Sequence, residues 1–97
     1  MPIPFHSSIE TSTAIRNCSS RQITLYLEPW AEEFLMPKES EIILVGHGPQ
    51  EGNGFSVDYL EDGIVVSAWT GSVVRVFSEG KELGDARSRP PVPDFDS

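Results

Sequence analysis

The clearest pattern in the chain is an alternation of apolar and polar positions between Phe55 and Trp69. Such alternation is typical of β-strands with one buried face. The stretch is interrupted by Asp62-Gly63, a dipeptide that favours a type I′ turn between antiparallel strands. A two-residue turn at this point places Tyr59 opposite Val66. We therefore predict a hairpin whose apolar side chains share one face.

The pattern continues beyond this hairpin. If Thr70-Gly71-Ser72 turns the chain, a third strand ending at Phe77 extends the apolar face, and residues 55–77 form a meander. A further tight turn at Glu79-Gly80 would pair Val76 with Leu83 in a short last strand.

The second face of this predicted meander is also partly apolar, because Val65, Trp69, Val73 and Phe77 fall on it. Apolar side chains on both faces of a sheet indicate either a further covering layer or a binding surface. We therefore take Trp69, Val73 and Phe77 as candidate partner-binding residues. Trp30, which follows a proline, is a fourth candidate for a side chain that reaches the surface or a pocket.

The first half of the chain gives two strands and one ambiguous segment. Residues 22–28 alternate as a half-buried strand should, and residues 41–46 form a continuous apolar run that predicts a central strand covered on both faces. Residues 29–37 fit either one or two helical turns or a strand that ends at the turn of residues 37–40. The short distance between Pro29 and Pro37 favours the strand, since so short a helix is poorly stable.

These elements predict an all-β fold: a small antiparallel β-sandwich, half jelly roll or barrel of about six or seven short strands. Residues 21–83 form the single β domain in this prediction. Residues 1–20, which are rich in Ser and Thr, are expected to be a loosely ordered, flexible N-terminal segment. Residues 84–97 read as a Pro-rich tail, either extended or disordered, or laid on the domain through Val92 and Phe95.

The net negative charge of the chain limits the kinds of partner that it can bind. A net charge of -8 disfavours nucleic acid and anionic membranes as partners, although it also suits a mimic of nucleic acid. Residues 21–60 hold seven acidic and two basic residues, and so carry five of the eight net negative charges. This half of the chain would favour a cationic partner or ligand.

Cys18 is the only cysteine, so the chain cannot form an internal disulfide. The N-terminal residues have neither a basic region nor an apolar run, and no segment approaches the ~20 apolar residues of a membrane span. A cytoplasmic protein is therefore expected.

Candidate chemistry is sparse. His47 lies in Gly46-His47-Gly48-Pro49, where we expect the central strand to end in a loop, and is a weak catalytic candidate beside Asp58 or Glu51, or paired with Cys18. The only other histidine is His6, so a cupin-like metal site, which needs several histidines, is not expected, nor is any cofactor. The glycines between Gly46 and Gly54 predict a plain connection or a lid.

The leading functional hypothesis is a non-enzymatic binding or regulatory domain that acts through protein–protein contact or homodimerisation. It would use the apolar patch or an exposed sheet edge. The first alternative is a small-ligand-binding, cupin-like barrel without a bound metal, its pocket lined by Trp30, Tyr59 and Trp69. The second alternative is a hydrolase-like or isomerase-like enzyme that uses His47.

Overall fold

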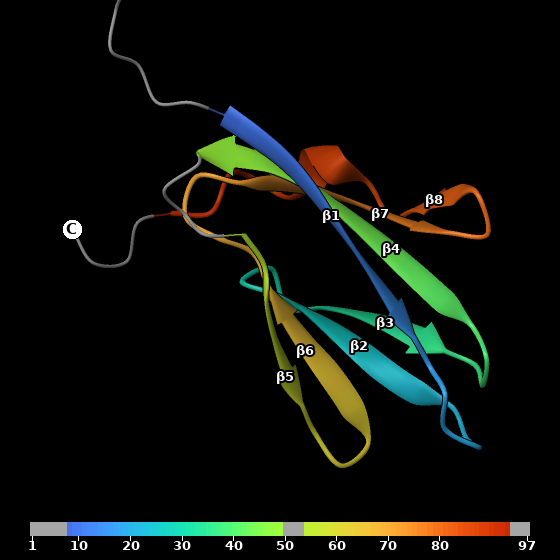
Figure 1. Cartoon of the computed structure of the whole chain (residues 1–97). Helices are drawn as coiled ribbons and strands as arrows, with labels where there is room; N and C mark the ends of the chain where they lie inside the picture. Colours follow the sequence, from blue (N-terminus) through green and yellow to red (C-terminus); the bar gives the residue numbers. More distant parts are fainter. Residues whose placement is uncertain (1–7, 50–53, 94–97) are drawn as a thin grey trace, which may run out of the picture.

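The computed structural model describes residues 8–49 and 54–93, which form two four-stranded sheets packed face to face (Figure 1). In sheet A the strand order is β1 (Ser8–Arg16), β4 (Glu41–Pro49), β7 (Val73–Ser78) and β8 (Lys81–Leu83). In sheet B it is β3 (Glu32–Met36), β2 (Ile23–Glu28), β6 (Gly63–Ser67) and β5 (Ser56–Tyr59). The all-β prediction is confirmed, with eight strands in the described residues where six or seven were expected.

The core lies between the sheets and follows the alternation of the sequence. Leu25 and Leu27 of β2 are fully buried against Leu44 of β4 and Val74 and Val76 of β7. Removal of such side chains from water is the main favourable contribution to folding. Every pairing in the two sheets is antiparallel except that of β2 with β6, which is parallel and places Leu25 beside Ile64.

The predicted β5–β6 hairpin forms, but its register differs by two residues. Tyr59 lies opposite Ile64, and the Leu60 N–H donates to the Gly63 carbonyl at 2.8 Å, so the two turn residues are Glu61-Asp62 in place of the predicted Asp62-Gly63. A shift of two keeps every side chain on its predicted face. Gly63 is required for close packing and not for a positive φ, because a Cβ there would lie 2.6 Å from the carbonyl oxygen of Thr24 on β2.

The predicted meander is wrong after residue 68. β6 pairs with β2 and β5, whereas β7 pairs with β4 and β8, so the turn at residues 69–72 carries the chain from one sheet to the other. The Ser72 N–H and hydroxyl both donate to the Trp69 carbonyl, at 2.9 and 2.6 Å. The turn at Glu79-Gly80 is confirmed: both residues have positive φ (53° and 79°), and Val76 pairs with Leu83.

The N-terminal segment was predicted to be loose, but Ser8–Arg16 forms a nine-residue strand paired with β4 along its full length. Its alternate residues Ile9, Thr11, Thr13 and Ile15 face inward. The strand was not predicted because only two of these four inward residues, the isoleucines, are apolar. Residues 29–37 contain strand β3, so the strand interpretation of this segment is confirmed.

β4 is central in sheet A, but it is covered on one face only, since Ile43 is 38% exposed. The strand continues to Pro49, so the loop predicted at residues 46–49 is part of the sheet. Gly46 and Gly48 face the interior. A Cβ on Gly46 would lie 2.7 Å from the Trp69 ring, and a Cβ on Gly48 would lie 2.7 Å from the Ser72 backbone. The glycines therefore allow close packing, and the remaining residues of the predicted glycine-rich lid, 50–53, lie outside the described residues.

The C-terminal segment was predicted to be a Pro-rich tail, but as far as Pro93 it is packed on the sandwich. It contains a 3₁₀ turn, η2 (Ala86–Ser88), whose N-cap Asp85 accepts a hydrogen bond from the Arg87 N–H. Val92 is buried, and its backbone pairs with residues 71 and 72 at 2.8 and 3.1 Å. Phe95, the other predicted contact, lies outside the described residues. None of the helical segments described is long and apolar enough to span a membrane.

Candidate functional site: the outer face of sheet A

The outward-facing side of sheet A carries a band of apolar side chains. Ile43 and Val73 are 38% and 39% exposed, and Val45 and Phe77 are half-buried beside them. Strand pairing sets Ile43 between Phe77 of β7 and Ala14 of β1. Val45, two residues further along β4, lies opposite Arg75 and is therefore diagonal to both Val73 and Phe77. We call Ala14, Ile43, Val45, Val73 and Phe77 the apolar band.

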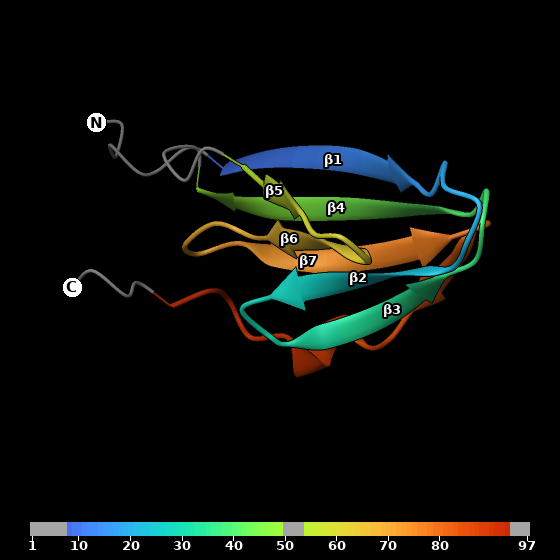
Figure 2. The ribbon, with the colours of Figure 1, turned by 90° about the horizontal axis from the view of Figure 1, so that it is seen from below.

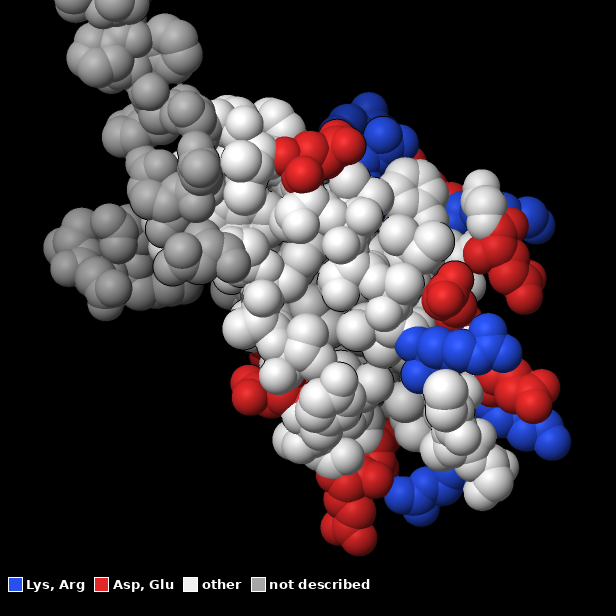
Figure 3. Space-filling model, in the orientation of Figure 1, with Lys and Arg blue, Asp and Glu red and all other residues white. Residues whose placement is uncertain are grey.

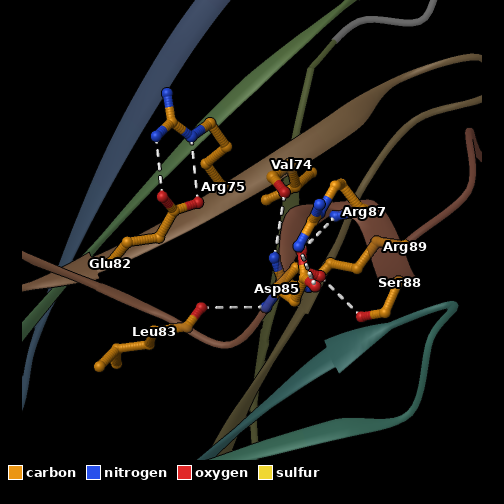
Figure 4. A network of polar contacts seen from close by, with 8 residues as sticks. All are labelled: Val74, Arg75, Glu82, Leu83, Asp85, Arg87, Ser88 and Arg89. Atoms are coloured by element: carbon orange, nitrogen blue, oxygen red, sulfur yellow. Dashed lines mark hydrogen bonds and ion pairs between the residues drawn. The ribbon is translucent and has the colours of Figure 1, made fainter.

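Arg75 lies within the apolar band, opposite Val45 and between Val73 and Phe77 on β7, and Glu82 lies opposite Phe77 at its edge. The Arg75 guanidinium donates from Nε and Nη2 to the two Glu82 carboxylate oxygens, at 3.0 and 2.8 Å (Figure 4). It also lies 5.1 Å from the centre of the Phe77 ring, a cation–π distance. The hydrogen bond from Arg75 lowers the pKa of the Glu82 carboxyl. This ion pair fixes Arg75 over the ring, so part of the band is shielded by a charged side chain.

Val73 and Phe77, two of the predicted binding residues, lie on this face, but Trp69 and Val65 do not. Trp69 is only 4% exposed, and its indole Nε1 donates to the Pro49 carbonyl at 2.8 Å. Its ring meets Phe55 edge-on at 5.4 Å over Gly46, inside the sandwich. Val65 faces outward from sheet B. The expected patch is therefore wrong in these two members, because the chain changes sheets between β6 and β7.

Trp30, the fourth predicted residue, is half-buried on the turn between β2 and β3. Its Nε1 donates to the Pro90 carbonyl at 2.9 Å, so it holds the C-terminal segment. The predicted ligand pocket of Trp30, Tyr59 and Trp69 does not form, since Trp69 is inside the core and Tyr59 is 78% exposed at the far end of β5.

His47 is on the outer face of sheet A, between Glu10 of β1 and Val73 of β7. Asp58, its proposed carboxylate partner, lies on β5 of the other sheet, and Glu51 lies outside the described residues. Cys18 is exposed beyond the end of β1, about 25 Å along the strand from the position opposite His47. These placements remove the predicted pairs of His47 with Asp58 and with Cys18, and the pair with Glu51 stays a prediction.

A shallow hollow lies at the other end of the molecule, between the loop after β1 and the β5–β6 turn. Its volume is about 210 Å³, and Cys18, Tyr59 and Leu60 line it. Typical small-ligand pockets measure about 300–1,000 Å³ and enclose most of the ligand. No group of three or more His, Cys, Asp or Glu side chains within residues 8–49 and 54–93 is arranged to hold a metal ion.

The most unusual polar residue, Arg89, was missed by the sequence reading. Its side chain is fully buried, and it donates from Nη1 to the Val74 carbonyl and from Nη2 to the Leu83 carbonyl, both at 3.2 Å (Figure 4). It also forms a two-pronged ion pair with Glu32 of β3. We call these four residues the Arg89 cluster. Arg89 stands in a stretch that reads as a tail, so no local pattern signalled its burial.

The Arg89 cluster connects the two sheets on one side of the sandwich, and its donors and acceptors are satisfied by one another. We assign this buried ion pair a role in holding the fold together, because removal of one partner would leave an uncompensated buried charge. The exposed apolar band on sheet A, in contrast, has no partner among the described residues. Searches of protein-family models, curated proteins and solved structures found no match.

Proposed function

We propose that this protein is a non-enzymatic binding module that docks a partner protein on the apolar band of sheet A. The observation that carries the proposal is the exposure of Ile43 directly opposite Phe77, continued through Val45 to the exposed Val73 on the same sheet face. Contiguous apolar surface on a folded protein costs solubility and commonly marks an interaction site.

The charges at the band support a partner that presents polar as well as apolar groups. Arg75, inside the band, is neutralised by Glu82 at its edge, and Glu10 stands beside His47 at the end of the band. Such polar groups at the rim of an interface act mainly on specificity and association rate. The small-ligand alternative has less support, because the described hollow is shallow and smaller than a typical pocket.

The test is site-specific photo-crosslinking in the cells that produce the protein. A photoreactive amino acid replaces Ile43 in one variant and Leu35 in the matched control. Leu35 is 65% exposed on β3 of the other sheet, so both probes are accessible. We expect a discrete crosslinked protein from position 43 only, and its loss when Val73→Glu is added.

Two results would contradict the proposal. Equal crosslinking from positions 43 and 35 would show that exposure alone decides the reaction. Persistence of the position-43 product in the Val73→Glu background would place the contact outside the apolar band. Circular dichroism of each variant checks that the sheets are intact, and little change is expected, since Val73 is an exposed residue at the end of the band.

A further inference from the structure

β1 is the longest edge strand of the sandwich and lacks the features that usually protect such an edge. It has nine residues and, within the described part of the chain, pairs with β4 alone. The other edge strands are shorter: β8 has three residues, β5 has four and β3 has five. Natural edge strands are commonly shortened or carry proline or inward-facing charge, whereas β1 contains no proline and faces inward with Ile and Thr only.

The free main-chain groups of β1 belong to its even-numbered residues. The Asn17 N–H, just beyond the strand, donates to Ser40 on the β4 side at 2.9 Å. Backbone N–H and C=O groups alternate in direction along a strand, so odd-numbered residues bond to β4 and even-numbered ones point away from it. A further antiparallel strand added to this edge must therefore pair with Glu10, Ser12, Ala14 and Arg16.

The charges of β1 are complementary to themselves. Glu10 and Arg16 are its only charged residues, and both project from the outer face of sheet A. Within the protomer, Glu10 pairs with His47, and Arg16 pairs with Glu41. An antiparallel copy of the strand centred on Thr13 would place Glu10 opposite Arg16 at both ends of the pairing. Opposite charges directly across two strands stabilise a sheet, and like charges destabilise it.

We propose that two copies of this chain pair through their β1 strands, antiparallel about Thr13, with Glu10 of each opposite Arg16 of the other. Sheet A then becomes one continuous eight-stranded sheet held by about eight main-chain hydrogen bonds. On its outer face a row of polar side chains, His47, Glu10, Arg16 and Glu41, crosses the seam, and the opposite charges of Glu10 and Arg16 meet at its centre. Moving the centre to Ser12 would set Glu10 opposite Ala14 and lose both ion pairs, so charge selects the register.

The surroundings of β1 suit such a seam. Figure 3 views the molecule from the side on which β1 and β5 lie, as in Figure 1, and its centre is uncharged, with acidic and basic side chains around the margin. The inward residues Thr11 and Thr13 are half-buried, so a paired strand would cover them further. The inference does not rest on the proposed docking surface, because the dimer needs only the edge of the sheet.

The experiment uses the full chain and two charge-reversal variants, Glu10→Arg and Arg16→Glu, in sedimentation velocity at several concentrations. We expect the wild type to dimerise and each variant alone to dimerise about tenfold more weakly, because each creates two like-charge contacts per dimer. An equimolar mixture of the two variants should recover dimers. In a mixed pair, the introduced arginine of one chain meets the introduced glutamate of the other at one end of the seam, and the native Arg16 and Glu10 meet at the other end.

A third variant, Ser12→Pro, removes an outward N–H at the centre of the pairing and should abolish the dimer while the monomer stays folded by circular dichroism. A wild type that remains monomeric at all concentrations would overturn the proposal. So would a dimer that neither charge reversal weakens, or a mixture no more dimeric than its components. None of these results bears on photo-crosslinking from position 43, so the two proposals can fail separately.

Discussion

The two long sides of the sandwich are closed in different ways. On the side of β3 and β8, the C-terminal segment crosses between the sheets, and Arg89 bonds to both of them. On the side of β1 and β5, no described segment crosses. Figures 1 and 2 show β1 and β5 along this side of the two sheets. The interior there is filled by Trp69 and Phe55, which pack over Gly46. The sheets are thus held together by a buried, fully hydrogen-bonded charge on the β3 and β8 side, and by close packing of aromatic rings behind the edge strands on the β1 and β5 side.

A small sandwich can therefore cover one pair of edge strands, here β3 and β8, and leave the other pair, β1 and β5, without a covering segment among the described residues. On the covered side, Arg89 donates hydrogen bonds to the main-chain carbonyls of Val74 and Leu83. On the other side, no strand among residues 8–49 and 54–93 pairs with the outward N–H and C=O groups of β1, which is the condition for strand addition. The predictions that follow test each side separately.

The largest effect is expected at the covered side, for Arg89→Ala. The change leaves Glu32 and two carbonyls without their donor, and breaking a buried ion pair in this way costs about 3 kcal/mol or more of unfolding free energy. Urea unfolding followed by circular dichroism measures it. The matched control is Arg87→Ala, two residues earlier, whose side chain is 92% exposed and whose loss should cost less than about 0.5 kcal/mol. Equal losses in the two variants would show that the cluster does not hold the sheets.

The next effect concerns the other side, where Gly46→Ala should lower the unfolding free energy by about 2 kcal/mol. A Cβ at this position would lie 2.7 Å from both the Phe55 and Trp69 rings, which must shift to admit it. Near-ultraviolet circular dichroism reports the movement of the indole. Gly80→Ala is the control, because it costs backbone strain at a φ of +79° but meets no neighbour within 4 Å. An aromatic spectrum that changes equally in both variants would contradict the packing role of Gly46.

The same comparison shows how far the sequence could predict the structure. Local alternation was enough for β2, β5 and β6, and turn chemistry was enough for the Glu79-Gly80 turn, because these depend on neighbouring residues. Turn chemistry placed the β5–β6 turn one residue too far along the chain, because Gly63 is needed for its close approach to Thr24 of β2 and not for the turn. The crossing between β6 and β7 could not be predicted in this way. A hairpin and a change of sheet present the same short Gly-containing turn, and the outcome depends on Trp69 finding space over Gly46, which is distant along the chain.

The residues of the candidate site also separate into those that local alternation could predict and those that depend on distant parts of the chain. Val73 and Phe77 were found because the alternation of β7 fixes which of its residues face outward. Ile43 was assigned to a buried face, because a continuous apolar run gives no sign of which side is covered. Arg89 had no signal, since its partners are Glu32, which is distant along the chain, and the main-chain carbonyls of two apolar residues. Long-range partners of a single residue are outside the reach of local patterns.

The smallest effect is a dependence of stability on pH at the border of the covered side. Hydrogen bonds from Arg75 and Arg87 lower the pKa values of Glu82 and Asp85 in the folded chain. A lowered folded-state pKa contributes stability that is present above the unfolded-state value, about 4, and is lost as pH falls through the folded-state value. Wild type should therefore lose stability on acidification below about pH 4, and Glu82→Gln should lose less of it over the same interval. The effect is small because both carboxylates are exposed to solvent. The measurement is the melting temperature of wild type and of Glu82→Gln from pH 6 to about pH 2.5, a range that spans these ionisations. Equal decreases in melting temperature for the two proteins would contradict this assignment.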